Sequence, residues 1–187
     1  MNKKTKGFSA KRLATDAILA AMFFALSMLA VEVAGVKITF VSLATVICAM
    51  IYGPVDALIV ALLGAFMEQM LKFGFTATTA LWIMPAAIRA LIIGMSTVVL
   101  KKQMSLEFVL EKKKPYVYFA VCLVAGLVTS LANTAVYYVD AKIFGYYSYA
   151  LIFGVLGVRL LSGIIASFIT AVVALPILAA LRKTNYI

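Results

Sequence analysis

Six long apolar stretches follow one another along the chain, and they restrict its fold more than any other feature. Inside a lipid bilayer every backbone polar group must be hydrogen-bonded within the protein, so apolar stretches of about 20 residues form helices. The 187 residues leave room for about five to seven of them. We place six, at residues 13–33, 38–52, 55–71, 79–100, 115–139 and 147–181. The sequence therefore predicts an all-α integral membrane protein, with residues 1–187 as a single bundle of six transmembrane helices.

Local signals refine these boundaries. Gly53-Pro54 is expected to stop one helix and start the next. The last stretch exceeds one bilayer thickness, so we expect it to tilt, to break near Gly154 or Gly157, or to project from the membrane. The basic N-terminus loosely resembles a signal peptide, but the apolar run after it is long enough to span. We therefore expect the first helix to be retained.

Charge placement predicts the orientation of the bundle. The chain has 17 Lys and Arg against 7 Asp and Glu, a formal net charge of +10. Three basic groups stand out, namely Lys3, Lys4, Lys6, Lys11 and Arg12; Lys101, Lys102, Lys112, Lys113 and Lys114; and Arg182 and Lys183. With six helices, all three groups and both termini lie on one side, which the positive-inside rule assigns to the cytoplasm. Nucleic acid is not an expected partner, because no soluble domain is left to carry a binding surface.

Two arginines lie deep inside apolar stretches, Arg89 in the fourth and Arg159 in the sixth. A charge at mid-membrane costs about 2.5–3.5 kcal/mol on insertion scales, so it normally faces a cavity or a partner. A guanidinium binds carboxylate or phosphate through a planar fork of N–H donors. We therefore expect Arg89 to bind the anionic end of a solute. Arg159 keeps two interpretations, a second ligand contact or a structural pair with an acid such as Glu68.

Polar and aromatic residues near the outer helix ends complete the predicted binding site. Glu68 and Gln69 end the third helix, beside a loop whose glycine and threonines suit a mobile gate. Trp82 is either a stacking surface for a flat heteroaromatic ring or an interfacial tryptophan. Asn133, one turn before Tyr137, is expected to meet a neighbouring helix or a ligand. The predicted substrate-binding residues are Glu68, Gln69, Thr78, Trp82, Arg89, Asn133, Tyr137 and Arg159.

Enzymatic chemistry finds little support in the chain. It has no histidine, no phosphate-binding glycine-rich loop and no paired carboxylates, so we expect no enzymatic activity and no catalytic residue. Cys48 and Cys122 are interpreted as buried packing thiols, and no metal site or cofactor is expected. The remaining polar residues after the fifth helix are assigned to the membrane interface and outer loop: Asp140, Lys142, Tyr146, Tyr147 and Tyr149.

Ala17, Ala21 and Ala25 recur every four residues in the first helix. Residues at this spacing share one helix face, where small side chains let another membrane helix approach closely. On the pattern alone, that helix belongs either to this bundle or to a separate membrane protein.

Taken together, these features resemble the substrate-binding S components of energy-coupling factor (ECF) transporters, over nearly the whole chain. The resemblance rests on the alanine face, the segment YGPVDA at 52–57, the stretch 74–94 with Trp82, Pro85 and Arg89, and Asn133-Thr134 followed by Arg159. It implies capture of a vitamin from outside, in the plasma membrane of a prokaryote. It also implies docking through Ala17, Ala21 and Ala25 on a membrane coupling subunit that two ATPase subunits drive, and toppling of the bundle to release the cargo.

The identity of the vitamin stays open. The pattern looks closest to the riboflavin- and folate-type S components, and folate is slightly favoured because a pterin suits Trp82 and a glutamate tail suits Arg89. The segment LWIMPAAIR at 81–89 departs from the folate pattern, so riboflavin, pantothenate or another substrate remain alternatives. Two other classes compete with this reading. One is a self-sufficient small carrier, and the other is an assembly protein whose arginines are paired internally.

Overall fold

The computed structural model describes residues 10–33, 36–101, 103–111 and 115–183, and most of them are helical. In chain order the elements are α1 (Ala10–Met28), β1 (Val31–Val33), β2 (Val36–Ile38), α2 (Ser42–Tyr52), α3 (Pro54–Phe73), α4 (Thr79–Val99), α5 (Leu106–Glu111), α6 (Tyr116–Ile143), α7 (Tyr149–Phe153) and α8 (Leu156–Lys183). Part of the basic groups lies outside the described residues, namely Lys3, Lys4, Lys6, Lys102 and residues 112–114.

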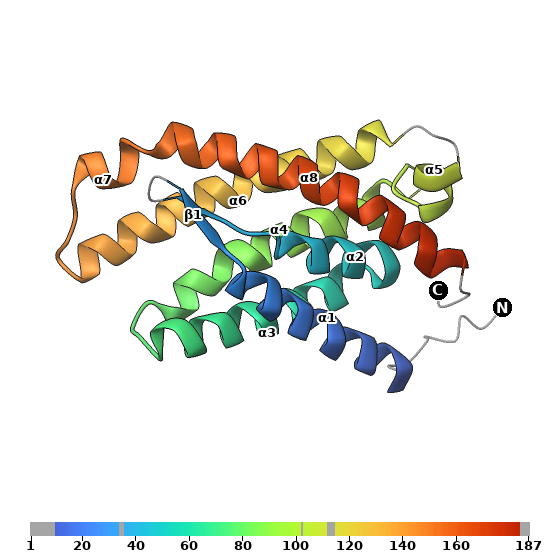
Figure 1. Cartoon of the computed structure of the whole chain (residues 1–187), viewed down its shortest axis with the longest axis horizontal. Helices are drawn as coiled ribbons and strands as arrows, with labels where there is room; N and C mark the ends of the chain where they lie inside the picture. Colours follow the sequence, from blue (N-terminus) through green and yellow to red (C-terminus); the bar gives the residue numbers. More distant parts are fainter. Residues whose placement is uncertain (1–9, 34–35, 102, 112–114, 184–187) are drawn as a thin grey trace.

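The long helices run up and down beside one another (Figure 1). The start of α1 and the end of α8 lie at the same end of the molecule as α5, on the right of the view. The loops 74–78 and 144–148 lie at the opposite end. α2 occupies the middle, where it packs against α1, α3, α4 and α8. Eight of its eleven residues are buried, so this short helix forms much of the core.

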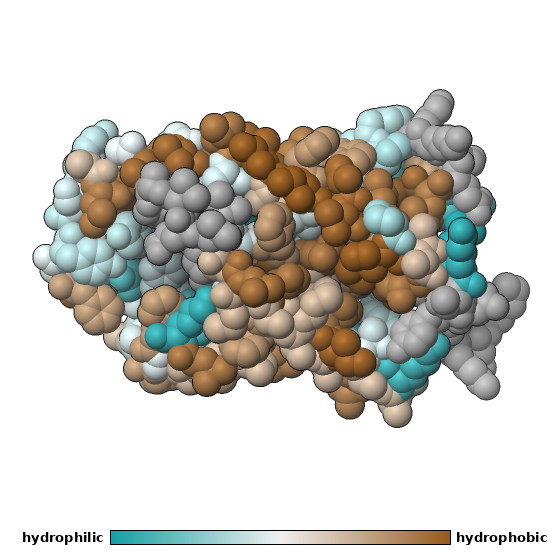
Figure 2. Space-filling model, in the orientation of Figure 1, coloured by the Kyte–Doolittle hydropathy of each residue, from teal (hydrophilic) through white to brown (hydrophobic). Residues whose placement is uncertain are grey.

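Among the described residues, four helical segments are long and apolar enough to cross a membrane: α3, α4, α6 and the combined α7–α8 segment Tyr149–Lys183. In the most apolar 18-residue stretch of each segment, no more than 39% of the residues are buried. Most of these apolar side chains therefore face outward. A soluble bundle turns its apolar face inward, whereas this one suits a lipid surround. Figure 2 shows the same arrangement, with hydrophobic residues along the middle of the molecule and hydrophilic residues gathered mainly at its ends.

The segment between the first two helices differs from the prediction. α1 ends at Met28 and α2 begins at Ser42, while β1 and β2 pair as an antiparallel hairpin with Glu32 opposite Lys37. In both strands, valine or isoleucine alternates with a charged residue, and this alternation favours a β-strand. Counting apolar residues alone does not detect the alternation. α2 extends only about 16 Å at 1.5 Å per residue, so it does not span a bilayer by itself.

Two predicted boundaries are confirmed. Gly53 separates α2 from α3 with a φ of 94°, a value that favours glycine, and Pro54 is the first residue of α3. The last apolar stretch breaks at Gly154, which lies between α7 and α8. The fifth predicted helix corresponds to α6, which runs to Ile143 instead of residue 139. This extra turn matters below, because it places Asp140 on the helix.

α6 and α8 approach each other closely at two glycine–serine pairs. A Cβ added to Gly126 would lie 2.0 Å from the Ser167 Oγ, and one added to Gly163 would lie 2.1 Å from the Ser130 Oγ. Each helix carries a glycine followed four residues later by a serine, a spacing that keeps both on one face. The two antiparallel helices therefore meet through small residues, as membrane helices commonly do.

Gly126→Ala is expected to force α6 and α8 apart and to destabilise the protein by about 1–3 kcal/mol, the usual effect of overpacking. Thermal unfolding in detergent measures this change. Gly157→Ala is the matched control, since no atom lies within 4 Å of a Cβ at that position. Equal melting temperatures for the two variants would show that the close approach is absent.

Candidate functional site

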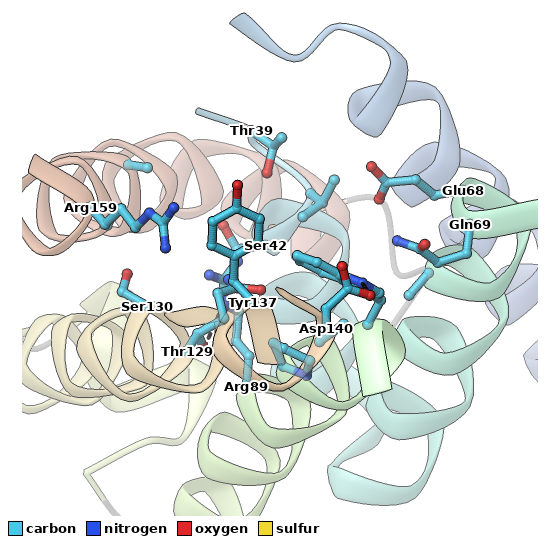
Figure 3. A pocket seen from close by; sticks show the side chains of 18 of the residues that line it. Thr39, Ser42, Glu68, Gln69, Arg89, Thr129, Ser130, Tyr137, Asp140 and Arg159 are labelled. Carbon is cyan, nitrogen blue, oxygen red and sulfur yellow. Dashed lines mark hydrogen bonds between the residues drawn. The ribbon is translucent and has the colours of Figure 1, made fainter. Parts of the chain in front are cut away.

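A cavity of about 610 Å³ lies between the helices in the half of the molecule that carries the loops 74–78 and 144–148 (Figure 3). Its walls come from α1, α2, α3, α4, α6, α8 and both loops. The volume lies within the range of about 300–1,000 Å³ that is usual for small-molecule sites. Most of the lining side chains carry a hydroxyl, amide or charged group, although the outside of the bundle is apolar. Such a cavity suits a solute that combines apolar surface with several hydrogen-bonding groups.

The structure brings all eight predicted substrate-binding residues to this one cavity. They are Glu68, Gln69, Thr78, Trp82, Arg89, Asn133, Tyr137 and Arg159. They come from α3, the 74–78 loop, α4, α6 and α8. Residues up to 91 positions apart in the chain thus line the same cavity. Their binding of a ligand remains a prediction.

Among the aromatic residues that line the cavity, Trp82, Tyr137 and Tyr146 pack against one another. The centroids of Trp82 and Tyr137 lie 6.1 Å apart, edge to face, and those of Tyr137 and Tyr146 lie 6.0 Å apart. Ring pairs at these separations attract each other beyond simple burial of their area. The result is an aromatic wall, formed by Trp82, Tyr137 and Tyr146, against which a flat ring can stack.

Asp140 connects this wall to both loops. Its carboxylate accepts hydrogen bonds from the Thr78 hydroxyl, from Trp82 Nε1 at 3.1 Å and from the Tyr146 hydroxyl. Partial burial, followed by the bond to Asp140, raises the pKa of Tyr146 above its ordinary value. The Tyr146 hydroxyl therefore keeps its proton at neutral pH and remains a donor.

Tyr146 lies in the 144–148 loop, as predicted, but the prediction left Asp140 and Tyr146 out of the cavity, which both of them line. Helical spacing carried the missing signal for Asp140. Asn133, Tyr137 and Asp140 stand at i, i+4 and i+7, which is one face of a helix. Several hydroxyl residues of the wall were also missed: Ser42, Thr45, Thr129, Ser130, Ser162 and Ser167.

The two intramembrane arginines extend from different helices toward the same part of the cavity, beside Tyr137 (Figure 3). Arg89 Nε donates to the Thr129 Oγ1 at 3.2 Å, and the Thr129 hydroxyl donates in turn to the Ala125 carbonyl. The Arg159 Cζ lies 4.7 Å from the centre of the Tyr137 ring. Within the described part of the chain, neither arginine forms an ion pair with an acid.

Glu68 pairs with a lysine instead of an arginine. The Lys72 Nζ lies 3.3 Å from the Glu68 Oε1 and 2.6 Å from the Ser27 carbonyl oxygen at the end of α1. Glu68 is therefore held at the rim of the cavity, and its charge is compensated there. The pair of Glu68 with Arg159 that the sequence left open does not form.

α1 has two different faces. Ala17, Ala21 and Ala25 are exposed, while Phe23 is only 2% exposed and lines the cavity. Packing inside this bundle therefore does not explain the alanine spacing. Contact of this face with a partner protein remains a prediction.

A helical membrane bundle around a polar cavity defines a small-molecule-binding membrane protein. Residues 7–183 match the family model of the ECF-type riboflavin transporter, S component, so the chain belongs to this family. The predicted resemblance to ECF S components is confirmed, and the chain is a non-enzymatic membrane subunit of a transporter. No curated protein sequence shows significant similarity to it.

Proposed function

We propose that this protein captures a flat heteroaromatic vitamin from outside the cell, riboflavin first among the candidates, and delivers it inward with an ATP-driven coupling module. In this proposal the chain crosses a prokaryotic plasma membrane six times, with the short α2 covering only part of the membrane thickness in the second crossing, and both termini lie in the cytoplasm. α5 belongs to the segment between α4 and α6 that carries one of the basic groups, and its position at the same end as the start of α1 and the end of α8 supports this orientation. The hairpin and the loops of the opposite half then face outward.

The single observation that carries the proposal is the polar cavity with its aromatic wall. A flavin or pterin ring needs a surface for stacking and hydrogen-bonding groups around its edge. Trp82 and Tyr137 supply the first, and Gln69, Asn133 and the hydroxyls of α6 and α8 supply the second. The name of the matching family supports riboflavin among the ligands of this shape.

A second candidate, an anionic vitamin such as folate, is favoured by Arg89 and Arg159. Both arginines face the cavity without an acidic partner among the described residues, whereas Glu68 has Lys72. Arg159 also lies in the first turn of α8, where the helix dipole adds to the positive potential. A carboxylate bound between them would neutralise this charge. With neutral riboflavin, the same guanidinium groups would donate to the ring carbonyl oxygens.

Filling the cavity is expected to weaken binding. Ala86→Phe places a phenyl ring inside it and should weaken vitamin binding roughly tenfold to hundredfold, because the bound ring and the new side chain compete for one volume. Isothermal titration of the purified protein with riboflavin, folate and pantothenate measures this and identifies the ligand. Ala87→Phe is the matched control, since the neighbouring Ala87 does not line the cavity. Binding of none of the three by the wild type, or equal losses in both variants, would contradict vitamin capture in this cavity.

Arg89→Met separates the two candidates. Loss of a hydrogen bond to a charged group removes about 1.5–3 kcal/mol, so a carboxylate vitamin should bind roughly tenfold to hundredfold more weakly. Riboflavin should lose less, because its carbonyl oxygens are neutral. Titration of wild type and variant with riboflavin and folate gives both numbers. An unchanged affinity for every ligand, in a variant that folds, would show that Arg89 does not contact the cargo.

Docking on the coupling subunit is expected to use the exposed alanine face of α1. Ala21→Trp fills the space between close-packed helices and should prevent co-purification with the coupling module, while vitamin binding stays near wild type. Val124→Trp, on the outer surface of α6, is a control with a comparable exposed site. Parallel loss of docking and vitamin binding would point to damage of the bundle instead of a docking face.

A further inference from the structure

Three segments meet at Asp140, near the outer end of α6. Its Oδ1 accepts from the Thr78 hydroxyl of the 74–78 loop and from Trp82 Nε1 of α4. Its Oδ2 accepts from the Tyr146 hydroxyl of the 144–148 loop. Asp140 is 8% exposed and Thr78 is 1% exposed, so the carboxylate is held away from solvent. No cation pairs with it among residues 10–33, 36–101, 103–111 and 115–183, and neutral donors satisfy its charge.

The donors belong to the parts of the molecule that a solute must pass or touch. Thr78 and Tyr146 come from the two loops that line the outer part of the cavity, and Trp82 belongs to the aromatic wall. Hydrogen bonds to an ionised acceptor are stronger than neutral ones. If the carboxylate is lost, the Thr78 hydroxyl and the indole N–H are left without their acceptor in a poorly solvated place. One side chain therefore couples both loops to the orientation of Trp82.

We propose that Asp140 is a positioning residue of the cargo site, which joins the loops 74–78 and 144–148 over the cavity and holds the Trp82 ring against Tyr137. The connection between the loops is independent of any cargo. Its effect on cargo rests on the proposed function. Because Asp140 holds the Trp82 ring at the place where the cargo stacks, its loss weakens the bound state, so Asp140 acts mainly on the rate of release and less on the rate of encounter.

The same turn of α6 offers an internal comparison. Lys142 Nζ lies 4.0 Å from the centre of the Tyr147 ring, and Tyr138 packs edge to face on Tyr147 at 5.5 Å. Neither Tyr138 nor Tyr147 lines the cavity. Tyr146 and Tyr147 are thus adjacent tyrosines of one loop, of which only Tyr146 donates to Asp140.

Trp82 is the single tryptophan of the chain, so its fluorescence reports directly on this network. Asp140→Asn removes the negative charge, which weakens the bonds from Thr78 and Trp82, and replaces one carboxylate oxygen with an NH2 group that cannot accept from Tyr146. In ligand-free protein it is therefore expected to shift the emission maximum of Trp82 and to increase its quenching by iodide. Tyr146→Phe and Thr78→Val each remove one donor and should give smaller changes in the same direction. If Asp140→Asn does not fold, these two variants still test whether Asp140 positions Trp82. Tyr147→Phe is the control and should match the wild type.

The double variant Asp140→Asn/Tyr146→Phe should behave like Asp140→Asn alone, because both changes break the same bond. Wild-type emission and quenching in all folded variants would overturn the positioning role. Equal changes in Tyr147→Phe and Tyr146→Phe would also overturn it, since the effect would then come from the loop in general.

Release of cargo gives the second readout. Stopped-flow dissociation of riboflavin, or of whichever tested vitamin binds, should be roughly tenfold to hundredfold faster in Asp140→Asn. The association rate should change less. An unchanged dissociation rate together with a changed Trp82 spectrum would overturn the control of release. A wild-type chain that binds no vitamin would overturn the proposed function instead, while the ligand-free fluorescence still tests the connection between the loops.

Discussion

A charge inside an apolar bundle needs a partner, and this requirement organises the polar residues of the protein. Asp56 at the start of α3 is fully buried and receives both Nε and Nη2 of Arg12 from α1, the latter at 2.6 Å. Breaking such a pair leaves an uncompensated buried charge, which typically costs about 3–5 kcal/mol. The pair therefore fixes how α1 sits on α3 at one end of the bundle. Lys72, bonded to Glu68 and to the end of α1, does the same at the other end.

The cavity exists because the helices approach closely elsewhere. α6 meets α8 through Gly126 and Gly163, and α4 reaches the start of α3 at Gly94, where an added Cβ would lie 2.4 Å from the Pro54 Cα. Without a hydrophobic force between helices in lipid, such close contacts supply the packing that holds a bundle together. Ser130, Gly163 and Ser167 belong both to the α6–α8 contact and to the cavity wall. A close contact between two helices thus forms one side of the binding space.

Much of this arrangement could be predicted from the sequence, because periodicity and membrane energetics act locally. The long apolar runs indicate helices whatever their neighbours are, and the energy needed to bury Arg89 and Arg159 indicates a cavity before any fold is known. The hairpin was missed because its valines count as apolar in a span as readily as in a strand. Asp140 was missed because one extra turn of α6 changes its surroundings from loop to cavity. Partners such as Arg12 for Asp56 lie 44 residues apart and depend on tertiary packing.

The two arginines differ in how much of the free-energy cost of removing their charge from water is offset by contacts within the protein. Arg159 lies over the Tyr137 ring. A cation–π contact contributes about 0.5–2 kcal/mol, which offsets part of the roughly 2.5–3.5 kcal/mol that a mid-membrane charge costs. Arg89 has one hydrogen bond from its Nε to a neutral hydroxyl, a net contribution of about 0.5–1.5 kcal/mol. Thr129 is itself held by the Ala125 carbonyl, so that bond orients the Arg89 guanidinium more than it neutralises it. Arg89 is therefore the charge that most needs a ligand. Arg159 lies over the Tyr137 ring, and this ring also packs against Trp82. The positive charge of Arg159 is therefore in direct contact with the aromatic wall.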